Sequence, residues 1–280
     1  MTHLVKTACI QLNSGPDIAD NLAVCAALIR EAAAEGAEMI LTPENTCHMR
    51  TPQSAKLESS PPEEHHPGLP LFSDLAQELG IWLLAGSFSV RVADDKIANR
   101  SYLFSDHGEM VAFYDKIHLF DVDLPTGESH RESDLVRGGG RAVICGLPWK
   151  GAVLGMSICY DVRFPALYRM MAQHGATIMA VPSAFTVPTG MAHWESLLRA
   201  RAIETGSYVL APAQCGTHHG GRQTYGHAMI IGPWGDVIVE AEDEPDYIVA
   251  SLDMDAVARA RQAIPSLTHD REMTLDIIAG

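Results

Sequence analysis

The sequence has few basic residues for its length. Its 280 residues include 20 Lys and Arg against 35 Asp and Glu, which leaves a formal net charge of −15 at pH 7. Proteins that bind nucleic acid need a basic surface to neutralise phosphates, and this charge balance does not supply one. We therefore expect no nucleic-acid partner.

Long apolar runs are also missing. No stretch approaches the roughly 18 consecutive apolar residues that span a bilayer. The first residues, MTHLVKTACIQLN, do not have the layout of a secretory signal. These two absences predict a cytoplasmic protein with no membrane partner.

Cysteines are few and scattered. The six stand at positions 9, 25, 47, 145, 159 and 215, and none forms a C-x-x-C pair. This spacing fits neither a disulfide framework nor a zinc ribbon. A chain of this length can bury a large core without disulfides, so we expect free thiols in a reducing compartment.

Strand-like and helix-like patterns alternate along the chain, which predicts an α/β fold with mixed sheets. Strands are expected at 5–11, 39–42, 81–90, 101–104, 110–114, 142–145, 152–158, 177–181, 207–213, 227–231 and 247–252. Helices are expected at 18–36, 71–79, 164–174, 191–205 and 253–263, with Asp20 or Asn21 capping the first and Asp253 the last. Residues 48–70 contain five of the 16 prolines and predict a loop or lid. No shift in composition marks a boundary, so we expect one domain over 1–280, with a core from about 4 to 265 and a tail at 266–280.

Cys159 occupies the most informative position among the cysteines. The apolar stretch Val153-Leu154-Gly155-Met156-Ser157-Ile158 leads into it, and Pro165 follows at the expected start of a helix. Backbone N–H groups before a helix favour a thiolate and can hold an oxyanion. A lone cysteine is nevertheless often a small buried hydrophobe, so position alone leaves both interpretations open.

Two charged residues also follow apolar strands. Glu44 comes after Met39-Ile40-Leu41 through Thr42-Pro43, and Lys116 comes after Val111-Ala112-Phe113-Tyr114. Each alone is typical of a solvated strand end, but α/β sheets build their sites at the carboxyl ends of strands. The usual base for a nucleophilic thiol is histidine, yet none of the 13 histidines is singled out by its surroundings.

Taken in order, three motifs resemble the nitrilase (carbon–nitrogen hydrolase) superfamily. They are Pro43-Glu44, then Tyr114-Asp115-Lys116-Ile117-His118-Leu119-Phe120, then Gly155-Met156-Ser157-Ile158-Cys159-Tyr160-Asp161. The resemblance extends from residue 5 to about 265 and implies an α-β-β-α sandwich of two mixed sheets flanked by helices. It also implies that Glu44 is general base and acid, Lys116 stabilises the oxyanion and Cys159 is the nucleophile. An accessory glutamate fits Glu132 better than Glu128.

The chemistry implied by this resemblance is amide hydrolysis through a Cys thioester, with release of ammonia. The Lys116 ammonium and the Tyr160 N–H would hold the oxyanion. No metal and no organic cofactor is required. Substrate-binding residues are expected among Tyr160, Arg163, Phe185 and Phe120.

Residues after the cysteine narrow the resemblance to one branch of the superfamily. The motif Cys159-Tyr160-Asp161-Val162-Arg163-Phe164, with the segments between 182 and 227, resembles the small-acid amidases that act on deaminated glutathione. The sister omega-amidases, which act on 2-oxoglutaramate, match less well at 214–225, and another small amide or an N-carbamoyl compound stays open. The triplet Gly138-Gly139-Gly140 replaces the family's usual Pro-Gly, and residues 48–70 have no clear counterpart.

Several further interpretations follow from the sequence. The loop at 216–224, with His218, His219 and Arg222, is either a carboxylate-binding loop or a solvated basic loop. The family packs the helix after the cysteine and the helix at 191–205 across a dimer, which predicts a homodimer. A thiol redox protein and a non-catalytic binding protein are the alternatives from other functional classes.

Overall fold

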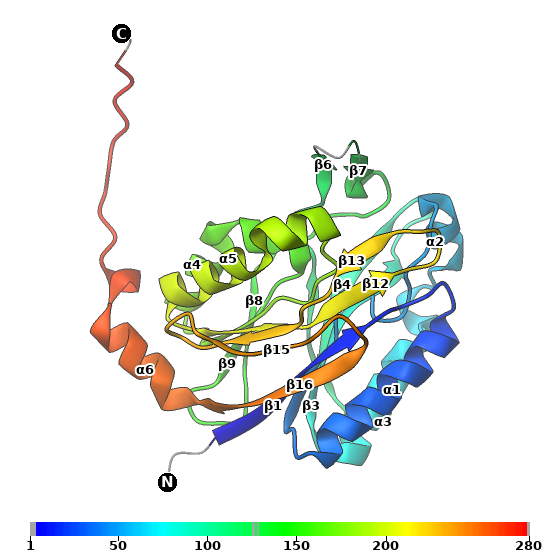
Figure 1. Ribbon diagram of the computed structural model, residues 1–280, viewed down its shortest axis with the longest axis horizontal. Coiled ribbons are helices and arrows are strands. Elements are labelled where there is room, and N and C mark those ends of the chain that lie inside the picture. Colours follow the sequence, from blue (N-terminus) through cyan, green and yellow to red (C-terminus); the bar gives the residue numbers. More distant parts are fainter. Residues whose placement is uncertain (1–3, 125–126, 128, 279–280) are drawn as a thin grey trace.

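The computed structural model describes residues 4–124, 127 and 129–278, so Glu128 lies outside the described residues. It has two mixed sheets and a small hairpin (Figure 1). The first sheet has the order β13-β12-β1-β2-β3-β4-β5, with β16 also paired to β1. Its strands are β1 (Leu4–Leu12), β2 (Met39–Leu41), β3 (Trp82–Arg91), β4 (Ile97–Phe104), β5 (Met110–Asp115), β12 (Ala213–Thr217), β13 (Gln223–Tyr225) and β16 (Asp246–Asp253).

The second sheet has the order β15-β14-β11-β10-β9-β8. Its strands are β8 (Val143–Gly146), β9 (Val153–Met156), β10 (Ile178–Ala180), β11 (Tyr208–Ala211), β14 (Met229–Ile231) and β15 (Val237–Glu240). Both sheets contain parallel and antiparallel pairs. The separate hairpin consists of β6 (Asp121–Asp123) and β7 (Ser129–Arg131).

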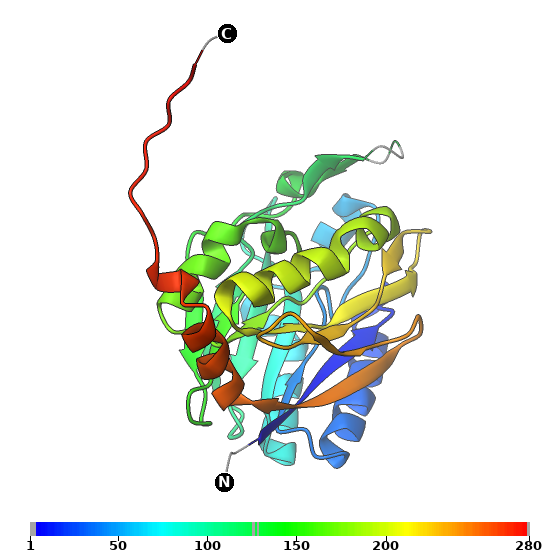
Figure 2. The same ribbon diagram turned by 60° about the vertical axis from the view of Figure 1, so that its left-hand side comes forward.

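Helices cover the outer faces of both sheets (Figures 1 and 2). Helices α1 (Ile18–Ala34) and α3 (Gly68–Leu79) pack on the first sheet, and α4 (Pro165–Gln173) and α5 (Val187–Thr205) pack on the second. Helix α6 (Met254–Ala263) follows β16, and the short α2 (Gln53–Ser59) lies beside the first sheet. This arrangement confirms the expected α-β-β-α sandwich.

The alternation of side chains along β1 explains how one strand serves two layers. Val5 and Cys9 belong to the core between the sheets, together with Leu154 of β9. Ala8 and Ile10 point to the other face and pack with the apolar stripe of α1. The first sheet is therefore buried on both faces, which accounts for its long apolar runs.

The chain passes from one sheet to the other where one continuous strand was expected. The stretch predicted as a strand at 207–213 divides at Pro212 into β11 of the second sheet and β12 of the first. Proline has no N–H for a ladder bond, so it interrupts pairing at the crossing point. This crossing places β12 and its following loop beside the end of the sheet that holds Glu44.

Other boundaries also differ from the sequence expectations. Residues 48–70 are not a plain loop, because they contain α2, a 3-10 turn at Glu63–His65 and the start of α3. Helix α1 is capped by Asp17, whose side chain accepts the N–H groups of Ala19 and Asp20, so the expected cap at Asp20 or Asn21 was wrong. The expected cap of α6 at Asp253 is confirmed.

Candidate active site

Glu44 follows the buried strand β2 and has a dense set of donors. Its Oε1 accepts from Lys116 Nζ at 2.9 Å and from Asn99 Nδ2 at 2.8 Å. Its Oε2 accepts the backbone N–H of Ala184 at 3.0 Å. The side chain is 5% exposed, so both carboxylate oxygens are fixed in an environment with little water.

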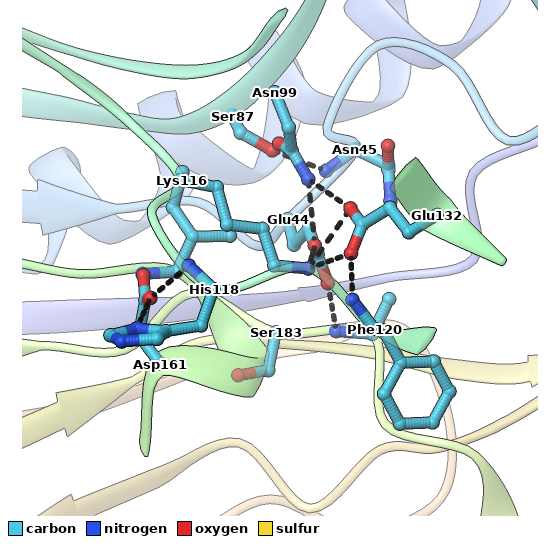
Figure 3. A network of polar contacts seen from close by, with 12 residues as sticks. Glu44, Asn45, Ser87, Asn99, Lys116, His118, Phe120, Glu132, Asp161 and Ser183 are labelled. Carbon is cyan, nitrogen blue, oxygen red and sulfur yellow. Dashed lines mark hydrogen bonds and ion pairs between the residues drawn. The ribbon is translucent and has the colours of Figure 1, made fainter. Parts of the chain in front are cut away.

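Lys116 stands one residue after β5 and bridges two carboxylates (Figure 3). Besides Glu44, its Nζ donates to both oxygens of Glu132, at 3.1 and 2.8 Å. Glu132 is held in turn by the backbone N–H of Phe120 at 2.7 Å and by Asn99 at 3.3 Å. A buried ammonium between two carboxylates keeps its charge and a fixed position.

Cys159 lies just past β9 in a strained turn. Its backbone φ is +49°, a left-handed conformation that non-glycine residues adopt rarely and mostly at functional sites. Its N–H donates to the carbonyl of Pro182 at 2.9 Å, and the turn continues as a 3-10 helix over Cys159–Arg163. The helix expected at 164–174 begins at Pro165, as α4.

Burial and charge set the protonation states of these three side chains. Burial favours a higher pKa for Glu44, but the charge of Lys116 and the hydrogen bonds from its neighbours bring that pKa below the usual value. Burial opposes a charge on Lys116, yet Glu132 and Glu44 raise its pKa well above the usual range. Burial, followed by the charge of Glu44, raises the pKa of the Cys159 thiol far above its ordinary value. The resting site therefore contains a carboxylate, an ammonium and a neutral thiol.

The position of Cys159 before a helix does not make it a thiolate in the resting site. The buried environment and the neighbouring carboxylate both disfavour a second negative charge at this place. Loss of the thiol proton therefore requires an acceptor, and Glu44 is close enough that it and Cys159 shift the pKa of one another.

Asp161 joins the loop after Lys116 to the turn at Cys159. Its buried carboxylate accepts the phenol of Tyr114 at 2.7 Å and both the backbone N–H and ring Nδ1 of His118 at 3.0 and 2.7 Å. It also accepts the backbone N–H of Ile158 at 2.9 Å. The Asp161 carboxylate thus fixes the end of β5, which leads to Lys116, relative to the end of β9, which leads to Cys159.

The glycine triplet that departs from the family pattern supports the backbone around Lys116. The N–H of Gly139 donates to the Lys116 carbonyl at 2.8 Å, and a Cβ at Gly139 would overlap the backbone oxygen of Asp115. A Cβ at Gly140 would meet no neighbour within 4 Å. A Cβ at Gly138 would lie 3.3 Å from the Ile117 carbonyl oxygen, so packing requires glycine most strongly at the middle position of the triplet.

A cavity of about 860 Å³ opens over these residues. Of the residues expected from the sequence, it is lined by Glu44, Lys116, Phe120, Glu132, Cys159, Tyr160, Phe185, His218, His219 and Arg222. Arg163 does not line it: its guanidinium lies over the rings of Tyr160 and Phe185 and contacts His193. The cavity is also lined by Arg50 and Lys56 from the segment expected to be a loop or lid.

Both ring nitrogens of His218 lie within hydrogen-bond distance of other residues of the fold, so they are not available to a ligand. It is buried, with Nδ1 within 2.9 Å of the Ser14 carbonyl and Nε2 within 2.6 Å of Thr224 Oγ1. Arg222, in the same loop, also lines the cavity. Its guanidinium donates to the carbonyl of Ala184 and has no carboxylate partner among the described residues.

Sequence reasoning missed three side chains of the site. Asn99 holds both Glu44 and Glu132, and Lys56 donates to Asn45 Oδ1 at 2.7 Å beside Glu44. The amide of Gln214 donates to the Glu44 carbonyl at 3.1 Å.

Within the described ranges, no group of three or more His, Cys, Asp or Glu side chains is arranged to hold a metal ion. No described helix has the length and apolar character needed to cross a membrane.

Comparison with known proteins decides the family. The model of the family described as carbon-nitrogen hydrolase matches residues 6–262. The chain belongs to the carbon–nitrogen hydrolase family. Among curated members, it is 40% identical over 264 residues to the deaminated glutathione amidase of Synechocystis sp., a match that covers 94% of this chain and 96% of the relative.

Solved structures of other carbon–nitrogen hydrolases share the fold. Saccharomyces cerevisiae Nit3, a member of branch 10 of the nitrilase superfamily, superposes with a TM-score of 0.85 at 30% identity, covering 96% of this chain and 97% of that one. An amidase from Nesterenkonia sp. AN1 superposes with a TM-score of 0.78 at 26% identity, covering 93% and 98%. The latter is a glutamate-to-glutamine mutant in which acrylamide has added to the active-site cysteine. The chain is therefore an amidase of this family, a hydrolase of non-peptide carbon–nitrogen bonds.

Proposed function

We propose that the chain hydrolyses small amides through a thioester on Cys159, with Glu44 as general base and acid and Lys116 as the cation that stabilises the oxyanion. One observation carries this proposal: a buried Lys116 Nζ joins Glu44 and Glu132 at a cavity that also exposes the Cys159 thiol. Nucleophile, proton acceptor and fixed positive charge are the three groups that acyl transfer needs.

Acylation follows from the protonation states of the resting site. As the Cys159 sulfur bonds to the amide carbon, its proton passes to Glu44 and the carbonyl oxygen becomes an oxyanion. The Lys116 ammonium and the N–H of Tyr160, which lies in the first turn of a 3-10 helix, hold that oxyanion. Glu44 then protonates the leaving nitrogen, the carbon–nitrogen bond breaks and a thioester remains.

Deacylation uses the same three side chains. Glu44 takes a proton from water as the water oxygen attacks the thioester carbon, and the same oxyanion site is used again. The carbon–sulfur bond breaks, the acid product leaves and the proton on Glu44 returns to the sulfur. Glu132 is proposed as a positioning residue, because its hydrogen bonds within the described residues go to Lys116, Asn99 and the backbone N–H of Phe120 rather than to the Cys159 thiol.

The substrate that we propose is deaminated glutathione. Relatives of this name, at about 40% identity over nearly the full chain, support it. In deaminated glutathione the γ-carboxyl of 2-oxoglutarate, which stands in place of glutamate, is joined to cysteinylglycine, so hydrolysis of that amide releases cysteinylglycine and 2-oxoglutarate. The ammonia expected from the sequence would come only from a primary amide such as 2-oxoglutaramate.

A panel of four compounds tests this assignment. Deaminated glutathione, 2-oxoglutaramate, an N-carbamoyl amino acid and a simple nitrile are assayed side by side by the acid product and by the released amine. We expect kcat/KM for deaminated glutathione to exceed that of each other compound by at least about tenfold, the range that pocket contacts commonly supply. A preference for 2-oxoglutaramate would replace the proposed substrate by that of an omega-amidase, and the absence of any hydrolysis would refute the function.

The thiol redox alternative has less support from the structure. The described residues that line the cavity include one cysteine, Cys159, so a resolving thiol is not present there. The six cysteines are all free thiols, which supports our proposal that the protein acts in a reducing compartment such as the cytoplasm.

We also propose that the chain forms a homodimer through α4 and α5. These helices lie side by side on the second sheet, and Met170, Met191 and Ile203 on them are more than half exposed. These exposed apolar side chains are available for a protein–protein contact. Light scattering should give about twice the monomer mass of 30.3 kDa, and a monomer at micromolar concentration would refute the dimer.

A further inference from the structure

Two side chains bridge the carboxylates of Glu44 and Glu132. Lys116 Nζ donates to the Oε1 atoms of both, at 2.9 and 3.1 Å, and Asn99 Nδ2 donates to the same two oxygens at 2.8 and 3.3 Å (Figure 3). The ammonium supplies a charge, whereas the amide is neutral. The second bridge therefore adds hydrogen bonds to the carboxylates without adding another charge.

Asn99 is placed beside Lys116 by the pairing of β4 and β5. Arg100 pairs with Asp115 in this antiparallel ladder, and the N–H of Lys116 donates to the carbonyl of Asn99 at 3.0 Å. Residues opposite each other in an antiparallel pair have their side chains on the same face. Asn99 is 4% exposed and does not line the cavity formed by the described residues, so it acts on the carboxylates and not on a substrate.

The orientation of the Asn99 amide is decided by its donor end. Its Oδ1 is buried and has no hydrogen-bond partner among the described residues, which is a costly state for a polar atom. The reversed amide would place this oxygen against two carboxylates, which have no proton to donate when they are ionised. The unpaired Oδ1 is therefore the consequence of pointing the two N–H groups at Glu44 and Glu132.

The two oxygens of Glu44 differ in how many of their lone pairs accept a hydrogen bond. Each carboxylate oxygen has about two such sites. Lys116 and Asn99 occupy both sites at Oε1, whereas at Oε2 the N–H of Ala184 occupies one, at 3.0 Å. Burial and then the charge of Glu44 raise the pKa of the Cys159 thiol, and a hydrogen bond from the same Ala184 N–H lowers it. Oε2 is therefore the oxygen that lies on the side of the sulfur and has a free site.

We propose that Asn99 is a positioning residue that keeps both lone pairs of Glu44 Oε1 occupied and thereby directs the proton of the Cys159 thiol to Oε2. Without the amide donor, Oε1 has a free site away from the Ala184 N–H. A proton taken there is not placed for transfer between the sulfur and the leaving nitrogen. This inference rests on the proposed function, because it concerns how Glu44 transfers protons during hydrolysis.

The variants Asn99→Leu and Asn99→Asp separate the donor from the shape of the side chain. Leucine is close to asparagine in size and donates nothing, whereas aspartate keeps the shape and adds a third carboxylate. We expect kcat to fall about 10- to 100-fold in Asn99→Leu and further in Asn99→Asp, with KM changed by less than about threefold. A packing role predicts the opposite order. A loss in Asn99→Asp no larger than in Asn99→Leu would overturn the proposal, as would an effect confined to KM.

The pH profile gives a readout that a packing role does not move. Burial raises the pKa of Glu44, but Lys116 and hydrogen bonds that include the one from Asn99 bring it below the usual value. Loss of that bond raises the pKa, so the acid limb of kcat/KM should move up by about 1 pH unit in Asn99→Leu. This variant keeps all the ionisable groups around Glu44, which are Lys116, Glu132, Cys159, Lys56 and Arg222. Coincident acid limbs in the variant and the wild type would contradict the assignment.

Asn13→Leu is the matched control for the loss of an asparagine amide. Asn13 is exposed outside the cavity, and its Nδ2 donates to the backbone carbonyls of Cys215 and Thr217 instead of to a carboxylate. This variant should keep the wild-type kcat and the wild-type acid limb, and thermal unfolding at neutral pH checks that each variant is folded. An acid limb that moves equally in Asn13→Leu would also overturn the role of Asn99.

A titration of Glu44 itself separates this inference from the proposed function. Glutamate labelled at its side-chain carboxyl with the NMR-active carbon isotope is incorporated, and the Glu44 resonance is assigned by its absence in Glu44→Gln. With no substrate present, we expect its midpoint to be about 1 pH unit higher in Asn99→Leu than in the wild type or Asn13→Leu. Equal midpoints would overturn the role of Asn99. Separate midpoints without hydrolysis of any amide would refute only the amidase function.

Discussion

Replacing Cys159 by alanine is expected to lower amide hydrolysis by at least about 10⁴-fold, the scale of loss when the nucleophile of a covalent mechanism is removed. Without the sulfur there is no thioester, and Glu44 and Lys116 are left with no acyl acceptor. The fold should survive, because the change removes one sulfur at the wall of a cavity and alanine is no more strained than cysteine at φ +49°. Initial rates by product release and thermal unfolding check both statements.

Cys145→Ala is the matched control, since Cys145 is a free, half-buried thiol that does not line the cavity. It should keep wild-type rates. Hydrolysis by Cys159→Ala within tenfold of the wild type would contradict the mechanism. A redox protein would instead release no amine in either form.

Glu44→Gln is expected to lower kcat/KM by about 10²- to 10⁴-fold, the usual contribution of a general base. Glutamine matches the size of glutamate and retains an oxygen to accept the N–H of Ala184, but it cannot take the proton of the thiol. Because the charge of Glu44 raises the pKa of Cys159 and that of Lys116 lowers it, the substitution should lower the pKa of the thiol. Alkylation of Cys159 should therefore be at least as fast as in the wild type while hydrolysis is lost.

Retained alkylation of Cys159 together with loss of hydrolysis would distinguish the loss of a general base from damage to the site. Glu58→Gln, at an exposed position of α2, controls for the change in charge and should alter neither rate. Retained hydrolysis in Glu44→Gln would exclude Glu44 as the base, and loss of both reactions would indicate a structural effect.

The sequence was most informative where strands end. Glu44, Lys116 and Cys159 each follow an apolar run, and apolar strands of a buried sheet can be read directly from such runs. The structure brings these three residues to one cavity, as the order of the motifs predicted.

Residues within elements were harder to find. Asn99 lies inside β4, whose expected start at 101 came four residues too late, and a polar residue in a strand does not by itself indicate which face it occupies. Helix α2 was missed because none of its seven residues is fully buried, so it has no apolar stripe to recognise. Lys56, which lies on it, therefore had no signal in the sequence.

Two points that the sequence left open are decided by tertiary contacts. Local backbone geometry favours a thiolate at Cys159, but burial and the neighbouring carboxylate raise the pKa of the thiol. His218 was considered for substrate binding from the composition of its loop, yet both ring nitrogens contact Ser14 and Thr224. Neither partner is identifiable from a linear pattern.

The most direct test of the central claim is to trap the acyl group with hydroxylamine during hydrolysis of the best amide substrate. A thioester on Cys159 reacts with hydroxylamine to give a hydroxamic acid and the free thiol, in competition with water. The account predicts hydroxamate formation at the expense of the acid product, in the wild type and not in Cys159→Ala. Hydrolysis that continues with the acid as the sole product at saturating hydroxylamine would contradict a covalent intermediate.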